Sequence, residues 1–256
     1  MQANYHTHTI RCHHAVGTER EYIEAAIAAG ITELGFSDHS PYPFSDGYVS
    51  NFRMALEETA GYFETLRALK AEYADRITIH IGFEAEYYPQ YFAAMREHVR
   101  SFGCDYLIMG QHFLYNEVER IYSGTATEEE ERLAQYVDQV IEGLSTGAYT
   151  YLAHPDLVTW TGSEEIYRKH SLRLCRAAKQ LEIPLELNLL GQAETRQYPS
   201  ERFFRIAAEC GCDAIIGCDA HDPQAFAHAE AERQARELAQ RCGIRVLPRL
   251  EVLRRP

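Results

Sequence analysis

The stretch from Gln2 to His14 reads QANYHTHTIRCHH, a short β-prone run that leads into four histidines. Side chains of an extended strand repeat every two residues, so we expect His6 and His8 to point to the same side of the chain. An H-x-H pair is compatible with metal binding, but a single pair in a strand is more often incidental. Its meaning therefore depends on which residues stand at the ends of the other strands.

Outward from this stretch, a pattern of short apolar strand, polar turn and amphipathic helix repeats seven times over the 256 residues. The predicted strands are Gln2–His6, Thr32–Ser37, Arg76–Phe83, Tyr106–Gly110, Tyr149–Ala153, Pro184–Asn188 and Ala214–Gly217. The predicted helices are Thr18–Ala29, Phe52–Tyr73, Gln90–Phe102, Glu128–Leu144, Glu164–Gln180, Ser200–Glu209 and Pro223–Cys242. Thr18 and Glu21 have capping-box spacing, and Gly30 stands where a helix C-cap glycine belongs.

Seven βα units in one run predict an α/β protein with a parallel sheet, and this length favours a closed or nearly closed barrel in a single domain, residues 1–256. An open, doubly wound sheet is the competing architecture. That fold normally carries a glycine-rich phosphate loop after its first strand, and the segment Thr7–Arg11 contains no glycine.

The composition is that of an ordinary globular protein, with 46% hydrophobic and 25% charged residues. Seven cysteines without a C-x-x-C pair favour a reduced compartment. The sequence shows neither signal-peptide features nor an apolar run of about 18 residues, so we expect a cytoplasmic protein without a membrane partner. A formal charge of −13 argues against a nucleic-acid partner, although bound divalent cations could make one region locally positive. The oligomeric state stays open.

Metal-compatible side chains stand at the end of every predicted strand. The clusters are His6-Thr7-His8 with Cys12-His13-His14, Asp38-His39, Glu84, Gly110-Gln111-His112, His154-Pro155-Asp156, Glu186-Leu187-Asn188 and Asp219-Ala220-His221. The carboxyl ends of the strands of a parallel barrel meet on one face, so these residues are expected to share one cavity. Each cluster alone has a plain structural explanation, such as a turn or a buried histidine, but seven coincidences are hard to accept. Spacing does not decide between His13 and His14.

The set combines imidazoles and carboxylates without thiolates, which suits catalytic zinc, iron or manganese better than a closed structural zinc site. One ion takes about three to six ligands, so the number of candidates predicts more than one ion. Neighbouring metals that share a hydroxide and a carboxylate are a standard arrangement for phosphoryl displacement. The sequence therefore predicts a metal-dependent phosphatase.

With these motifs the chain resembles the PHP (polymerase and histidinol phosphatase) family, and within it the histidinol-phosphatase branch. The matching motifs are His6-Thr7-His8-Thr9, Cys12-His13-His14, Ser37-Asp38-His39-Ser40-Pro41, Gly82-Phe83-Glu84, His112, Ala153-His154-Pro155, Glu186-Leu187-Asn188 and Asp219-Ala220-His221. The resemblance implies a distorted TIM-like (β/α)7 barrel. One departure is Gly110-Gln111-His112, where the branch often has Ser and an extra residue before this histidine, so the local wall is expected to differ.

The resemblance also implies three divalent metal ions. His6, His8, Glu84 and Asp219 would hold the first, Glu84, His112 and His154 the second, and His14, His39 and His221 the third. His14 is preferred to His13 because the third-metal histidine of the family lies eight positions after the first. The implied reaction is hydrolysis of L-histidinol phosphate, a small-molecule phosphate ester, to L-histidinol and phosphate in histidine biosynthesis.

For the chemistry we predict a metal-bridging hydroxide that attacks phosphorus in line. Arg196, in a segment resembling the Arg-x-Tyr-Pro pattern of the family, is the candidate phosphate clamp, because a guanidinium can bind phosphate through two parallel hydrogen bonds. Asn188 is expected to orient a ligand or a water. Asp38 and His39 are candidate general acids, unless the metals make one unnecessary. Aromatic residues in the segment 42–44 and near Tyr115 are candidate contacts of the leaving group.

Three alternative functions are compatible with the sequence. The first is a PHP phosphoesterase that acts on a nucleotide, a sugar phosphate or phosphotyrosine. The second is a metal-dependent amidohydrolase, which also begins with H-x-H but typically has eight strands and a carboxylated lysine where Glu84 stands here. The third is a non-catalytic metal-binding scaffold, against which the full set of nine candidate ligands argues.

Overall fold

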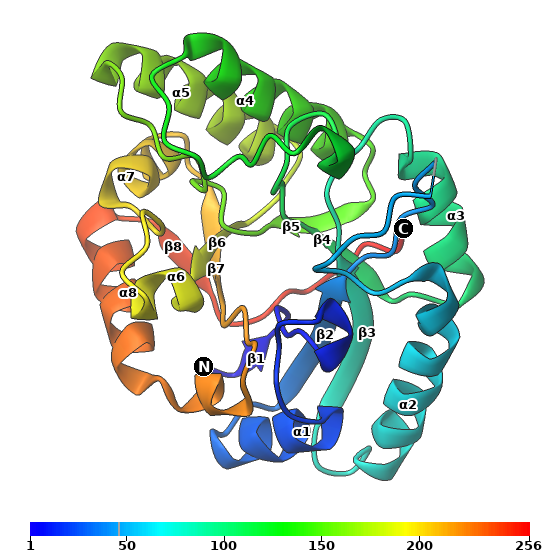
Figure 1. The fold of residues 1–256 in the computed structure, drawn as a ribbon. Helices are drawn as coiled ribbons and strands as arrows, with labels where there is room; N and C mark the ends of the chain where they lie inside the picture. Colours follow the sequence, from blue (N-terminus) through cyan, green and yellow to red (C-terminus); the bar gives the residue numbers. More distant parts are fainter. Residues whose placement is uncertain (46) are drawn as a thin grey trace.

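The computed structural model describes residues 1–45 and 47–256, and its eight parallel strands form one sheet in the order β1 to β8. The sheet curls around a central space and the helices pack outside it (Figure 1). The strands are β1 (Ala3–Asn4), β2 (Glu33–His39), β3 (Thr78–Glu84), β4 (Tyr106–Met109), β5 (Tyr149–Leu152), β6 (Leu185–Asn188), β7 (Asp213–Gly217) and β8 (Arg245–Leu247). The α-helices are α1 (Glu19–Ala28), α2 (Thr59–Glu72), α3 (Phe92–Ser101), α4 (Glu130–Ser145), α5 (Glu164–Gln180), α6 (Leu189–Ala193), α7 (Glu201–Glu209) and α8 (Ala229–Cys242).

The barrel closes through the residues just beyond β1 and β7. Thr7 and Ala220 form a parallel bridge, with His8 N donating to Ala220 O at 2.9 Å and Ala220 N donating to His6 O at 3.1 Å. β8 instead pairs with the amino-terminal part of β7. The predicted distorted TIM-like barrel is therefore confirmed, and closure brings the segments of His6, His8 and the strand-seven cluster side by side.

The structure contains two elements that the sequence pattern did not indicate. β8 spans only Arg245–Leu247, too short a run to stand out from the segment after α8. α6 spans Leu189–Ala193 and begins directly at the end of β6, without an intervening turn. The predicted helix 52–73 starts later, with the 3₁₀ turn η2 (Leu56–Glu58) before α2, and residues 52–55 are not helical. The predicted helix 223–242 begins with a separate 3₁₀ turn, η4 (Pro223–Ala227).

Tyrosines fill the interior of the barrel away from its carboxyl end. Tyr106 lies inside, and its hydroxyl donates to Tyr5 O at 2.8 Å and to Phe36 O at 3.2 Å. The C-terminal segment covers this end, where Leu250 N donates to the Tyr5 hydroxyl at 3.1 Å. Because these fully buried rings occupy the lower barrel, an open cavity can form only at the carboxyl ends of the strands.

The outer helices bury their apolar faces against the sheet in one large cluster of aliphatic and aromatic side chains. At α1 the predicted capping box is present, because Thr18 and Glu21 bond each other reciprocally, and Gly30 has φ +79° just beyond the helix. None of the helices within the described residues is long and apolar enough to cross a membrane.

Gly82 on β3 provides space for Tyr106, so Gly82→Ala tests the tyrosine packing. A Cβ at this position would overlap both the carbonyl oxygen and the ring of Tyr106. We expect a loss of about 1–3 kcal/mol in the free energy of unfolding, because overpacking a close-packed interior forces neighbouring groups apart. Urea or thermal denaturation followed by circular dichroism measures the change.

Gly61→Ala is the matched control, because nothing lies within 4 Å of a Cβ at this exposed position of α2. It should be stabilising by up to about 1 kcal/mol, as expected for Ala replacing Gly in a helix. Equal stability of the Gly82→Ala variant and the wild type would contradict the close packing described for Tyr106.

Candidate metal centre

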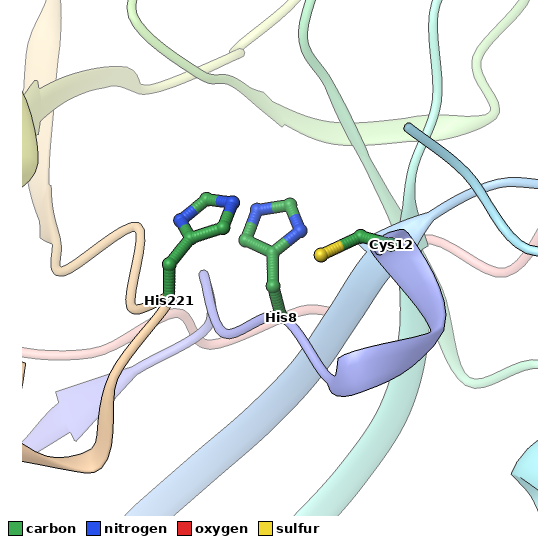
Figure 2. A group of neighbouring side chains, drawn as sticks. All are labelled: His8, Cys12 and His221. Carbon is green, nitrogen blue, oxygen red and sulfur yellow. The ribbon is translucent and has the colours of Figure 1, made fainter. Parts of the chain in front are cut away.

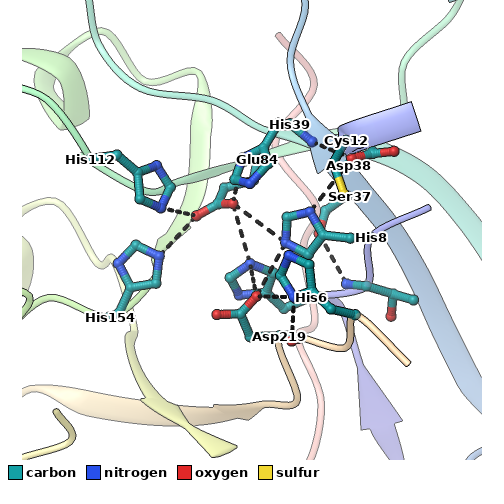
Figure 3. A network of polar contacts seen from close by, with 12 residues as sticks. His6, His8, Cys12, Ser37, Asp38, His39, Glu84, His112, His154 and Asp219 are labelled. Atoms are coloured by element: carbon teal, nitrogen blue, oxygen red, sulfur yellow. Dashed lines mark hydrogen bonds and ion pairs between the residues drawn. The ribbon is translucent and has the colours of Figure 1, made fainter. Parts of the chain in front are cut away.

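The nine predicted metal ligands all lie at the carboxyl end of the barrel, in and beneath one cavity. Figure 3 shows how His6, His8, His39, His112, His154 and Asp219 gather around Glu84. His6 and His8 come just after β1 and are fully buried, and His39 and Glu84 are the last residues of β2 and β3. The other five come from the loops after η1 (Ile10–Cys12), β4, β5 and β7 and line the cavity: His14, His112, His154, Asp219 and His221. The tertiary structure thus brings together the residues that the sequence placed at successive strand ends.

The carboxylate of Glu84 stands at the centre of this group and divides it into two sides. Its Oε1 lies 2.9 Å from His154 Nε2 and 3.5 Å from His112 Nε2. Its Oε2 lies 3.5 Å from the Nε2 atoms of both His6 and His8. This is the arrangement that a carboxylate bridging two metal ions requires.

Asp219 lies on the Oε2 side of Glu84, with His6 and His8. Its Oδ1 lies 3.4 Å from His6 Nε2 and 3.2 Å from His8 Nε2, so these three residues offer ligand atoms to one point. The backbone of Asp219 has φ +51°, and His154 has φ +29°. Both are non-glycine residues in a conformation that costs free energy, and such residues concentrate at functional sites.

A third group is formed by His14, His39 and His221, whose ligand atoms lie within 4.8 Å of one another. Spacing alone did not decide between His13 and His14, but the two residues lie in different places in the structure. His14 lies 4.7 Å from His221 and 5.5 Å from His39, measured between ring centroids. His13 adopts φ 67° as the C-cap of η1, is exposed and is absent from the cavity lining.

Buried carboxylates hold two of the histidines from behind. Glu186 Oε1 lies 2.8 Å from His6 Nδ1, and Glu86 Oε1 lies 2.9 Å from His112 Nδ1. Each pairing fixes the ring so that its other nitrogen faces Glu84, as second partners of metal-binding histidines commonly do. Glu86 is held in turn by the buried guanidinium of Arg53 at 2.9 Å. Neither Glu86 nor Arg53 was predicted from the sequence; only the i, i+2 spacing of Glu84 and Glu86 on an extended segment hinted at a connection.

Two glycines make room for these carboxylates on neighbouring strands. A Cβ at Gly110 would overlap Glu84 Oε1, and one at Gly217 would overlap Glu186 Oε1. The unusual Gly110-Gln111-His112 sequence therefore has a steric explanation at Gly110. Gln111 is buried and its side chain accepts from Tyr87 N at 2.9 Å.

Asp38 and Asn188 lie next to predicted ligands and do not line the cavity. Asp38 accepts hydrogen bonds from both the amide and the hydroxyl of Thr9, and its Oδ1 lies 3.5 Å from His8 Nδ1. Asn188 donates to Asp219 Oδ2 at 3.1 Å and to Glu186 Oε2 at 2.8 Å. This geometry suits both residues to orienting ligands, and it keeps Asp38 away from any leaving group in the cavity.

Cys12 is a close neighbour of the site and was not among the ligands predicted from the sequence. The ring of His8 lies between Cys12 and His221 (Figure 2), and the ligand atoms of these three residues lie within 4.8 Å of one another. Burial alone would raise the pKa of the Cys12 thiol, but contacts with His14 and His8 outweigh it and lower the pKa. The thiol is fully buried beneath the cavity, where it packs against the His8 ring.

The crowded charges change the protonation of the site. Burial alone would raise the pKa of Glu84, but His112 and other imidazoles hold it well below its ordinary range. Burial and the nearby His8 lower the pKa of His221 to about 3, and burial lowers that of His39 well below its usual value. His221 and His39 are therefore neutral near pH 7, which is the form in which imidazole binds metals.

The donor set fits divalent metal ions. Within the described residues, several buried ring nitrogens have no hydrogen-bond partner: His6 Nε2, His8 Nε2, His39 Nδ1 and His221 Nε2. Unpaired buried polar atoms are costly, and here they converge with two carboxylates on the same space. Imidazole nitrogens and carboxylate oxygens in this combination are typical ligands of zinc, iron and manganese.

The cavity above these residues has a volume of about 580 Å³. Its remaining lining consists of aromatic residues together with an arginine and a glutamate: Phe52, Phe113, Tyr122, Tyr198, Arg196 and Glu194, with Asn51 and Leu190. Arg196, the predicted phosphate clamp, is part of this lining. Tyr42, Phe44 and Tyr115 are not part of the lining, whereas Phe113, near Tyr115, is. Tyr42 is buried against Tyr88 instead, at 4.9 Å between ring centroids.

Comparisons with known proteins agree on one family. A sequence model of the PHP domain matches residues 4–189. A probable histidinol-phosphatase of Deinococcus radiodurans is 30% identical over 250 residues, covering 92% of this chain and 93% of that protein. A histidinol-phosphatase of Lactococcus lactis is 25% identical over 238 residues, covering 85% and 83%. The crystal structure of histidinol phosphate phosphatase from Lactococcus lactis, complexed with zinc, L-histidinol and phosphate, has the same fold. Its TM-score is 0.72 at 22% identity, over 96% of this chain and 95% of that one.

Glu186→Gln tests whether the carboxylate behind His6 matters for metal binding. The substitution keeps the size of the side chain but removes the charge that orients His6. We expect the affinity for divalent metal to fall about 10- to 100-fold, as is usual when such an outer partner is lost. Metal content after dialysis against a graded chelator series, measured by mass spectrometry, gives the affinity.

Glu33→Gln is the matched control, because Glu33 also pairs with a histidine, His80 at 2.9 Å, but near the amino end of the barrel. Its metal content should equal that of the wild type. If Glu186→Gln retained metal as well as Glu33→Gln, the carboxylate behind His6 would have no role in holding metal.

Proposed function

Because the chain belongs to the PHP family, whose domain matches residues 4–189, we propose that it is a metal-dependent phosphatase that hydrolyses L-histidinol phosphate to L-histidinol and phosphate. One observation carries this proposal: seven imidazoles and two carboxylates, with Glu84 among them, gather in and beneath a cavity of about 580 Å³. The proposed domain extends beyond the matched residues to residue 256, since Asp219 and His221 belong to the same site.

We propose that the site binds three divalent ions of zinc, iron or manganese, each held by one of three groups of residues. His6, His8, Glu84 and Asp219 would hold the first, Glu84, His112 and His154 the second, and His14, His39 and His221 the third. Bound divalent ions would neutralise charge on the phosphate oxygens and generate the attacking nucleophile from water at neutral pH.

Buried side chains behind the proposed ligands hold them in position. Glu186 holds the Nδ1 side of His6, and Asn188 holds Asp219 through its amide. Asp38 anchors the Thr9 backbone and faces the Nδ1 side of His8. These three buried groups stiffen the ligands, and ligands held in place need no reorganisation when substrate binds.

Arg196 is proposed to bind the phosphate group. Its guanidinium lies in the cavity wall, and its Nη1 donates to the Tyr198 hydroxyl at 2.8 Å. Burial raises the pKa of Tyr198 above its ordinary value, and burial also raises that of Tyr122. Both phenols therefore stay protonated and can donate hydrogen bonds to phosphate oxygens beside Arg196.

The substrate assignment predicts selective turnover. The purified, metal-loaded protein should hydrolyse L-histidinol phosphate with a higher kcat/KM than a nucleoside monophosphate, a sugar phosphate or phosphotyrosine, and a chelator should abolish the activity. Release of inorganic phosphate under steady-state conditions measures each rate. Negligible turnover of L-histidinol phosphate beside efficient cleavage of another ester would refute the substrate. A His6→Ala/His8→Ala variant that lost metal but kept full activity would refute the site.

Arg196→Met should lower kcat/KM for L-histidinol phosphate by about 10- to 100-fold, because charge-assisted hydrogen bonds contribute about 1.5–3 kcal/mol. Arg196→Lys should recover only part of this loss, since an ammonium lacks the planar fork of the guanidinium. The exposed Arg168 on α5, paired with Glu209 at 2.6 Å, supplies the control Arg168→Met, which should leave kinetics unchanged. Wild-type kinetics of the Arg196→Met variant would remove Arg196 from the phosphate site.

A further inference from the structure

Glu194 is a carboxylate of the cavity wall that the proposed reaction does not use. Among the cavity-lining residues that the structure describes, Glu84 and Asp219 face the histidine cluster, and Glu194 is the remaining acid. It caps the C-terminus of α6 and its side chain is 51% exposed. It therefore lies near the rim, away from the buried ligands.

In this structure Glu194 forms an ion pair with Arg196, whose guanidinium is proposed to bind phosphate. Glu194 Oε2 accepts from Arg196 Nε at 2.7 Å and lies 2.6 Å from Arg196 Nη2. The remaining Nη1 donates inward to Tyr198, whose side chain is buried. Three of the five N–H donors of Arg196 are therefore engaged, and its Nε–Nη2 side becomes available to phosphate only when Glu194 leaves.

The backbone holds the acid and the arginine together. Thr195 between them has φ +54°, a left-handed conformation that is unfavourable for a β-branched residue. Glu194 N donates to Leu190 O and Arg196 N donates to Gly191 O, both at 2.9 Å, so α6 fixes the turn from both sides. The carboxylate thus stays in the cavity wall after it has left Arg196.

The same cavity has an aromatic part that suits a flat or cationic group. Phe113 lies 5.7 Å from both Phe52 and Tyr122, measured between ring centroids. Aromatic faces attract cations as well as planar rings. Together with Glu194, these rings provide the cavity with sites for a positively charged organic group next to a site for phosphate.

We propose that Glu194 binds the cationic end of the substrate alcohol by an exchange of partners with Arg196. This inference rests on the proposed function. The phosphate of the incoming ester takes over the guanidinium, and the released carboxylate pairs with the substrate's ammonium or imidazolium group. The ligand class is a phosphate monoester of an amino alcohol.

The exchange makes the cavity selective for esters that carry both charges. When the substrate has a cation, the ion pair lost between Glu194 and Arg196 is replaced by two new ones. When the alcohol is neutral, Glu194 is left without a partner close to a phosphate dianion, and like charges repel. Glu194 therefore acts against neutral esters as well as in favour of cationic ones.

Glu194→Gln tests this exchange with two esters, L-histidinol phosphate and phenyl phosphate, whose leaving group is neutral. We expect kcat/KM for L-histidinol phosphate to fall about 10-fold or more, chiefly through KM, because a charged hydrogen bond is lost. Inhibition by the product L-histidinol should weaken by a similar factor. Phenyl phosphate turnover and inhibition by inorganic phosphate should stay equal or improve, since Arg196 is released.

Glu165→Gln, at an exposed position of α5 outside the cavity lining, is the control and should match the wild type throughout. Glu194→Asp should restore part of the discrimination, because it restores the charge. A parallel fall for both esters, or unchanged inhibition by L-histidinol in Glu194→Gln, would overturn the exchange. If the wild type did not cleave L-histidinol phosphate, the proposed substrate would fail separately. In that case the turnover of phosphoethanolamine, a cationic ester, is compared with that of phenyl phosphate in the wild type and in Glu194→Gln. The same ratio of the two rates in both proteins would overturn the role of Glu194.

Discussion

The buried carboxylate of Glu84 is the group around which this molecule is arranged. Its two oxygens face different histidines, with His154 at 2.9 Å on one side and His39 at 3.1 Å on the other. A charge in this position is tolerated only when opposite charges surround it, because burial of an unpaired ion costs several kcal/mol. The strand ends, the glycine at position 110 and the carboxylates behind the histidines all serve to satisfy that one group.

Closure of the barrel determines where the charge can be placed. The bridge between Thr7 and Ala220 joins the first and seventh strand ends, and Tyr106 with its neighbours fills the space below. A packed lower barrel leaves only the carboxyl end open to ligands. The strained backbone of Asp219 is then supported by a rigid surrounding, which is the condition under which such conformations persist.

The charged groups at this site differ in how deeply they are buried, and buried and exposed groups have different roles. Glu84, Glu186 and Glu86 are fully buried, so their interactions are little screened by solvent and orient the histidines strongly. Glu194 and Arg196 lie at the rim, where water weakens an ion pair and allows it to exchange partners. The buried glutamates hold the metal-binding histidines rigidly, which suits chemistry shared by a whole family. The exposed pair Glu194–Arg196 can change partners, which suits selection of one substrate.

The sequence by itself determined the barrel class, the helices and the nine candidate ligands, because strand periodicity and strand-end position are local properties of the chain. It did not identify β8 or α6, which are too short to produce a periodic pattern. The family resemblance already preferred His14 to His13. Only the tertiary structure brought Glu86 to His112, set Cys12 beside the ring of His8 and placed Asp38 behind His8. The tertiary structure also buries Tyr42 against Tyr88 and places Phe52 in the cavity wall. These outcomes depend on side-chain direction and on contacts between distant loops, which spacing along a chain does not encode.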